Sequence, residues 1–334
     1  MKKILLDGEK PFYKGNMHCH STLSDGKMTP EELKAFYKAR GYHFLAITDH
    51  DSINCHSYLD DEDFITITSA EYSIKEFPEQ STLKNQRMKC CHMNLYAKEQ
   101  TNTKQICYSP VYDKYSKGER REALQRYNEG YQRIYSAEGI NDLIRIANEN
   151  GFFVAYNHPR WSLENYSHYS RYEGLWGVEV FNNACFFEGI FEYDIHVHDD
   201  LLRDGKRVFL SVGDDNHSEE MSGVAFVSVN AESLTYGALI DALLAGRFYA
   251  SFGPRILDLR VEDGIARIRT SEAVTIGFTT EGRRHGVLHA PKGESITEAS
   301  FEIRRDDGFV RFFVQDERGA RADTQAYFTQ QLFD

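Results

Sequence analysis

The chain has 334 residues, with 39 Lys and Arg against 51 Asp and Glu, and its formal net charge is −12 when histidine is neutral. This acidic balance disfavours a nucleic-acid-binding protein, because neutralising phosphates requires a basic surface. Since 41% of the residues are apolar, the chain can bury a sizeable core, and its length predicts two domains or one large α/β domain with an appendage.

Neither a membrane segment nor a disulfide framework is expected. No apolar run approaches the roughly 18 residues of a membrane helix, and Asp7 places a charge too early for a signal peptide. The six cysteines are scattered without CxxC spacing, which is typical of reduced thiols. We therefore expect a cytoplasmic protein that binds neither a membrane nor a nucleic acid.

Predicted strands and helices alternate through the first 250 or so residues. A first strand precedes His18, and Thr29, Pro30 and Glu32 form a capping box that begins a helix, which Gly41 ends. Further strands are predicted at residues 43–48, 64–69, 92–97, 152–157, 177–181 and 208–212, and further helices at 140–149, 189–203 and 233–245. Strands separated by helices indicate a parallel sheet, and about seven such units favour a (β/α) barrel.

Two segments depart from this alternation. Residues 98–136 are polar and rich in tyrosine, which indicates either a solvated insertion or a lid over the site. From residue 255 the chain consists of short β-rich runs joined by Asp-Gly turns, which predicts a small β-sandwich over 255–334. We therefore expect an α/β barrel over residues 1–254, interrupted at about 98–136, and an accessory β-sandwich domain.

Side chains that can bind metals lie at the ends of six predicted strands, with His92 and Asn94 at the start of one of them. Any one of them would more commonly be a helix cap or turn residue, but six together predict a metal site, because the carboxyl ends of parallel barrel strands converge on one face. His196 and His198 fall in a predicted helix, where residues two apart diverge by about 200°, so we do not expect them to bind a metal. The strand-end residues are His18, His20 and Asp25; Asp49 and His50; Glu71; His92 and Asn94; His158; and Asp215 and His217.

The order of these motifs resembles that of the PHP (polymerase and histidinol phosphatase) superfamily. The resemblance covers about two thirds of the chain and implies a distorted seven-stranded (β/α) barrel that holds up to three divalent metals. Residues 246–254 and the β-rich tail are further similar to the branch that includes carbaryl-hydrolase-like metallohydrolases. The motifs that carry the resemblance are His18-x-His20, Ser24-Asp25-Gly26, Thr48-Asp49-His50-Asp51, Glu71, His92, Asn157-His158-Pro159 and Asp215-x-His217.

The same resemblance implies three sets of metal ligands. Asp214 is an alternative to Asp215, because the chain reads Gly-Asp-Asp-Asn-His where the family commonly has Gly-Ser-Asp-Ala-His. Mixed nitrogen and oxygen ligands suit Zn, Mn or Fe, and the residues do not choose among these metals. The sets are His18, His20, Glu71 and Asp215 for the first metal, Glu71 as a bridge with His92 and His158 for the second, and Asp25, His50 and His217 for the third.

Such a centre predicts a metal-dependent phosphoesterase. Two or three divalent metals would activate a water to hydroxide near neutral pH, and they would make the pocket locally cationic, which suits a small phosphorylated substrate. A hydrolase of carboxylic esters, carbamates or amides is the alternative reading, and a non-catalytic module of the same fold is a third.

Three further residues are candidates for roles around the metals. Arg160 is expected to contact the phosphate, with a salt bridge to a nearby acid as its alternative role. Asp49 is expected to orient His50 or to act in proton transfer at the leaving group. Asn182 is a candidate helix cap or substrate contact.

Overall fold

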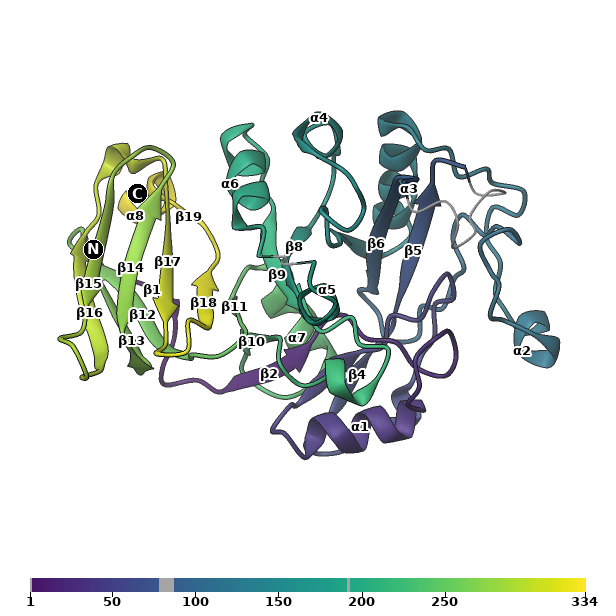
Figure 1. Ribbon diagram of the computed structural model, residues 1–334, viewed down its shortest axis with the longest axis horizontal. Coiled ribbons are helices and arrows are strands. Elements are labelled where there is room, and N and C mark those ends of the chain that lie inside the picture. The colour runs from purple at the N-terminus through teal and green to yellow at the C-terminus, as the bar shows by residue number, and fades with distance from the viewer. Residues whose placement is uncertain (1, 78–86, 191–192) are drawn as a thin grey trace.

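The computed structural model describes residues 2–77, 87–190 and 193–334 and has a mixed α/β architecture (Figure 1). A β-rich part, at the left of Figure 1, contains both marked ends of the chain, and most of the helices surround strands in the remaining part. The helices are α1 (Pro30–Lys38), α2 (Gly118–Glu122), α3 (Ala137–Glu149), α4 (Tyr166–Tyr169), α5 (Asn183–Phe187), α6 (Ile195–Arg203), α7 (Tyr236–Leu244) and α8 (Thr329–Phe333), with 3-10 turns η1 (Ser57–Leu59), η3 (Glu219–Met221) and η4 (Arg305–Asp307).

Within the described residues, the strands form three sheets. The first has the order β1 (Lys2–Leu6), β12 (Ile256–Glu262), β13 (Ile265–Ala273) and β16 (Ile296–Glu302). The second has the order β15 (His285–His289), β14 (Thr275–Thr280), β17 (Phe309–Gln315), β18 (Arg321–Thr324), β11 (Phe248–Ser251), β10 (Phe226–Asn230), β2 (Phe12–Asn16), β3 (Phe44–Ala46) and β4 (Ile65–Ile67), with β19 (Tyr327–Phe328) beside β17. The third has the order β5 (Ser69–Lys75), β6 (Cys90–Ala97), β7 (Phe152–Tyr156), β8 (Gly177–Asn182) and β9 (Phe209–Gly213).

Local sequence signals account for the helices that pack on these sheets. The predicted capping box is confirmed at α1, where the Thr29 side chain accepts from the Glu32 backbone and the Glu32 side chain accepts from the Thr29 backbone. In α3 the Ser136 side chain caps the first turn, and Ile140, Leu143 and Ile144 are buried on one face. Their i, i+3, i+4 spacing is the apolar stripe with which a helix packs on a sheet.

The strand directions correct the expectation of a wholly parallel sheet. The β2-β3-β4 and β7-β8-β9 groups are parallel, but β6 runs antiparallel to both β5 and β7, and β10 runs antiparallel to β2. Antiparallel neighbours need no crossover helix, so β5 and β6 can pair directly. Because β6 is reversed, its first residues lie at the edge where the parallel strands end.

A second correction concerns residues 64–69, which were expected to form one strand. The chain leaves the second sheet after Ile67 and enters the third at Ser69, whose hydroxyl donates to the carbonyl of Ile47 at 2.9 Å. Glu71 therefore lies inside β5 and not beyond the end of a strand. The predicted helix at 189–203 is shorter than expected, since α6 begins at Ile195, and residues 191–192 lie outside the described residues.

Two strand pairings join segments of this β-rich part to segments that are distant in the sequence. β1 pairs with β12, and β18 pairs with β11, so the second sheet runs without a break from the β-rich part into the α/β part. Leu259 and Ile268 of the first sheet and Ile276 and Phe312 of the second are buried in one apolar cluster.

The segment 98–136 is not simply a solvated insertion, which corrects one of its two expected roles. Ile106, Cys107 and Tyr112 are buried, although much of 117–132 is exposed. Buried Arg133 pairs with Asp51 and also donates to the carbonyl of Cys107 at 3.2 Å. This buried pair fixes the segment to the loop that follows β3. No helix within the described ranges has the length and apolar character to cross a membrane.

Candidate metal centre

The loops after β2 and β9 bring His18, His20 and Asp215 together. Backbone hydrogen bonds link the two loops, from Asp215 N to His18 O at 2.8 Å and from His20 N to Asn216 O at 3.2 Å. Between the two histidines, Cys19 directs its thiol to the carbonyl of Ala46, so the imidazoles share one side as strand alternation predicts.

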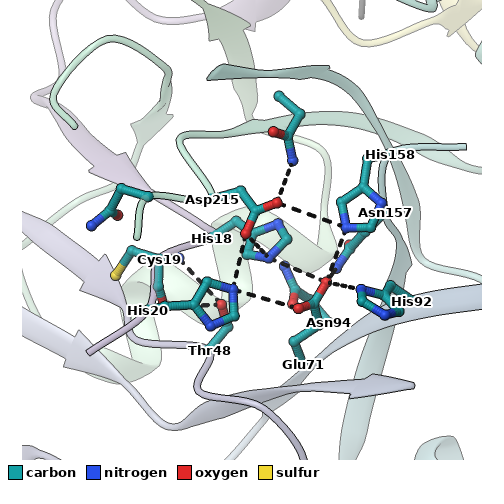
Figure 2. A network of polar contacts seen from close by, with 12 residues as sticks. His18, Cys19, His20, Thr48, Glu71, His92, Asn94, Asn157, His158 and Asp215 are labelled. Carbon is teal, nitrogen blue, oxygen red and sulfur yellow. Dashed lines mark hydrogen bonds and ion pairs between the residues drawn. The ribbon is translucent and has the colours of Figure 1, made fainter. Parts of the chain in front are cut away.

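These three side chains and Glu71 form the first group of candidate ligands (Figure 2). Asp215 Oδ1 lies 3.1 Å from His18 Nε2 and 2.9 Å from His20 Nε2, and Glu71 Oε1 lies 3.3 Å from His18 Nε2. Ligand atoms bound to one ion at about 2.1 Å are separated by about 3.0–3.4 Å. His18 Nε2, His20 Nε2 and Asp215 Oδ1 are buried and make no hydrogen bond, so the group fits a divalent cation.

Glu71 also belongs to a second group with His92 and His158. Its Oε1 lies 3.0 Å from His92 Nδ1 and 3.1 Å from His158 Nε2, and it accepts a hydrogen bond from Asn157 Nδ2 at 2.9 Å. His92 reaches this point from β6 because that strand is reversed, and His158 is the second residue after β7. One carboxylate is therefore shared by two groups of imidazoles (Figure 2).

The third group contains Asp25, His50 and His217, the expected ligands, and also His20, which thereby belongs to two groups. Asp25 Oδ2 lies 3.4 Å from His50 Nε2, and Asp25 Oδ1 lies 3.5 Å from His217 Nε2 and 3.7 Å from His20 Nδ1. The side chains of Asp25 and His217 are about one third exposed, at 33% and 36%, so this group is closest to solvent.

Asp214 and Asp215 have different surroundings, which bears on the alternative that the sequence leaves open. The Asp214 carboxylate accepts from the hydroxyl of Tyr37 at 2.7 Å and from three backbone amides, those of Gly223, Val224 and Ala225. Burial raises the pKa of Asp214 to about 6 against the effect of these hydrogen bonds. Since its oxygens already have partners, Asp215 is the aspartate that faces the other candidate ligands.

Glu179 is a site residue that the sequence reasoning missed. Its Oε1 lies 2.9 Å from His18 Nδ1, and its Oε2 accepts from His158 N at 3.2 Å. A carboxylate on the far nitrogen fixes the orientation of a metal-binding imidazole and raises its basicity. The available signal was an acidic residue within the otherwise apolar strand 177–181.

Asn182 caps a helix, as one of its two expected roles requires. Its Oδ1 accepts from Cys185 N at 2.9 Å at the start of α5, and its Nδ2 donates to Asp215 Oδ2 at 3.0 Å. The cap thus also holds one of the candidate ligands in place.

Asp49 and Arg160 lie in different environments. Asp49 is fully buried, and its oxygens accept from the backbone and hydroxyl of Ser21 and from the hydroxyl of Ser24. These contacts hold the loop that carries His20. Asp49 is not among the residues that line the cavity described below. Its position therefore differs from the expected role of orienting His50 or taking part in proton transfer. Arg160 is exposed and lines that cavity.

The electrostatics of the site favour positive charge at its centre. Burial lowers the pKa of His92 to about 4, whereas for His158 burial is outweighed by Glu71 and the pKa rises to about 9. Burial opposes ionisation of Glu71, but the charges of His92 and His18 hold its pKa below the usual range. The carboxylates therefore need cationic partners, and bound divalent ions and protons on the imidazoles are alternative ways to supply them.

The candidate ligands other than His18 and His20 line a cavity of about 1190 Å³ that the sequence reasoning did not describe. Trp161 covers one side, with its ring centroid 5.0 Å from those of both His92 and His158. Tyr115, from segment 98–136, covers another: its ring stacks on His50 at 6.1 Å, and its hydroxyl donates to Asp25 at 3.1 Å. From the sequence we also expect the loop of residues 75–89 to form part of the pocket wall, and residues 78–86 of this loop lie outside the described residues.

Comparison with known proteins finds one curated relative that matches a short part of the chain. No family model matches the chain. A 5′-3′ exoribonuclease of Haemophilus influenzae is 50% identical over 40 residues, which are 12% of this chain and 15% of that protein's length.

Two solved structures show distant similarity. One is a two-domain protein from Bacteroides vulgatus containing a predicted PHP-like metal-dependent phosphoesterase, with 15% identity, a TM-score of 0.45 and 96% of each chain covered. The other is an amidohydrolase from Chromobacterium violaceum, with 18% identity, a TM-score of 0.40 and coverage of 70% of this chain and 96% of that one.

Proposed function

We propose that this protein is a metal-dependent hydrolase of the PHP superfamily that cleaves phosphate esters of small molecules. The observation that carries the proposal is the convergence of nine side chains in three groups, in each of which the ligand atoms lie within 4.8 Å of one another. These are the same nine residues that the ordered motifs single out, and Glu71 belongs to two of the groups. Two or three divalent ions, Zn, Mn or Fe, would occupy them.

Different residues would hold the metals, orient the ligands and bind the substrate at such a centre. Bound divalent cations would lower the pKa of a water and stabilise negative charge as it develops on the substrate. Glu71 holds the first two groups together, and Glu179 orients His18. Arg160, on the cavity wall, is suited to bind a phosphate oxygen, because its guanidinium presents paired donors.

The proposal includes the domain organisation expected of this family. We assign residues 1–254 to a distorted (β/α) barrel, interrupted at about 98–136, and residues 255–334 to an accessory β-sandwich that β1 joins. In support, β9 lies beside β10 and β11, which brings the third sheet against the second. Apolar residues from both sheets of the β-rich part lie in one buried cluster, which extends to Leu33 and Leu45 of the α/β part.

The test is a substrate panel on protein reconstituted with Zn, Mn or Fe, with chelated protein as the blank. The panel contains phosphate monoesters and diesters, a short RNA, carboxylic esters, carbamates and amides; the RNA is included because of the exoribonuclease likeness. We expect turnover of small phosphate esters. Turnover confined to carbonyl substrates would overturn this choice in favour of an ester or amide hydrolase.

Two histidine variants test whether turnover depends on the candidate metal centre. His158→Ala removes a candidate ligand and should abolish turnover, whereas His196→Ala changes an exposed histidine on α6 and should leave turnover unchanged. Elemental analysis after reconstitution tests the third reading. Less than one metal per chain would indicate a non-catalytic module.

A further inference from the structure

The two tryptophans of the chain have opposite surroundings. Trp176 is 7% exposed and packs against Phe153, Phe209 and Phe248. Trp161 is 39% exposed and lines the cavity that contains the candidate ligands. An indole ring gains stabilising contacts when its large apolar surface is buried. The exposed surface of Trp161 is therefore open to such contacts with a bound ligand.

The position of Trp161 places this unburied surface next to the second group of candidate ligands. Its centroid lies 5.0 Å from those of His92 and His158, at interplanar angles of 45° and 73°. Val111 and Leu163 line the same cavity, and each is 47% exposed. We call Trp161, Val111 and Leu163 the wall of the cavity, and we call the charged candidate ligands its floor. The wall is apolar and aromatic, and Trp161 is its residue beside His92 and His158.

The cavity also has more room than a phosphate group requires. Its volume of about 1190 Å³ exceeds the range of roughly 300–1,000 Å³ that is typical of sites for drug-sized ligands. Lys114 and Arg160 supply positive charge on its lining. A substrate that matches the whole surface has an anionic group for the floor and a flat apolar group for the wall.

We propose that Trp161 is a specificity-determining residue, and that the organic part of the substrate carries a planar ring which stacks on its indole. The proposal rests on the proposed function, since it takes the phosphate to lie over the candidate metal groups. In a phosphate monoester the organic part is the leaving group, so the ring lies on the side of the leaving oxygen. Stacking of this kind contributes binding energy without requiring a particular pattern of hydrogen bonds.

Two esters that differ mainly in planarity provide the test. Benzyl phosphate and cyclohexylmethyl phosphate both release a primary alcohol, so the chemical step is closely matched. We expect metal-loaded protein to prefer the benzyl ester by about threefold to tenfold in kcat/KM. Trp161→Ala should reduce this preference to about one through KM, and Trp161→Phe should retain most of it.

The controls distinguish a stacking surface from a structural cover. Tyr58→Ala changes an aromatic residue that is 65% exposed outside this cavity, and it should leave the preference intact. Metal content should stay at the wild-type value in Trp161→Ala. An unchanged preference in Trp161→Ala, or loss of metal from it, would overturn the proposal.

A binding measurement separates this proposal from the proposed function. Because Trp176 is buried, iodide should quench the fluorescence of Trp161 selectively, and benzylphosphonate should protect it more than cyclohexylmethylphosphonate does. Protection by benzylphosphonate without hydrolysis of any phosphate ester would support the ring site and refute the phosphoesterase. Equal hydrolysis of both esters without protection would support the phosphoesterase and refute the ring site.

Discussion

Replacement of Glu71 by glutamine tests the shared carboxylate most directly. The side chain is 1% exposed, and its oxygens lie 3.0–3.5 Å from nitrogens of five imidazoles, those of His18, His20, His50, His92 and His158. Glutamine keeps the shape but removes the charge and turns an amide towards nitrogens that would bind a metal. We expect both groups that contain Glu71 to lose their ions.

The expected size of the effect follows from the number of groups that each acid joins. An ion present at 100 times its dissociation constant stabilises the folded state by about 2.7 kcal/mol, so loss of two ions removes about 5 kcal/mol of metal-dependent stability. At about 2 °C per kcal/mol for a chain of this size, the metal-induced rise in Tm should fall by about 10 °C. Asp25 belongs to one group only, so Asp25→Asn should lose one ion and about half of that rise.

The assay combines elemental analysis with thermal unfolding, with and without added metal, for the wild type and both variants. A wild-type metal content in Glu71→Gln would refute the shared role. Equal losses in Glu71→Gln and Asp25→Asn would refute the assignment of Glu71 to two groups and Asp25 to one.

Three further substitutions probe residues around the centre. Arg160→Ala should raise KM for a phosphate ester about tenfold and leave kcat nearly unchanged, since binding is lost without loss of the nucleophile; an unchanged KM would contradict phosphate contact. Asp214→Asn should keep the full metal content but reduce the free energy of unfolding in urea by about 2–4 kcal/mol, because a buried carboxylate with several donors is lost. A missing ion in this variant would show that Asp214, not Asp215, is the ligand. Arg133→Met should reduce the free energy of unfolding by about 3–5 kcal/mol, because Asp51 is left buried without its partner. It should also speed hydrogen exchange in residues 105–116. Unchanged exchange would contradict the role of this pair in fixing the segment.

Much of the site could be predicted because its signals are local. The alternation at His18 and His20 depends only on an extended backbone, and the cap at Thr29 depends on neighbouring residues. The sequence order of the motifs then singled out the nine side chains that the fold brings together.

The failures concern contacts between distant segments. The strand break between Ile67 and Ser69 and the reversal of β6 are decided by sheet pairing, which the apolar pattern of residues 64–69 does not contain. In the sequence, Glu179 is only an acidic residue within an apolar strand. Its role depends on His18, which is distant in the sequence and contacts it only in the folded chain. Asp49 was placed at the reaction because it adjoins His50, but its carboxylate turns to Ser21.

The pairing of β1 with β12 has a consequence for synthesis. Lys3 pairs with Val261, so the first strand leaves the ribosome roughly 10–50 s before its partner at 5–20 residues per second. During that interval its backbone groups are open to other nascent chains, and in the finished sheet it remains an edge strand. The charges of Lys2 and Lys3 oppose pairing with a second copy, which is the protection that edge strands commonly carry.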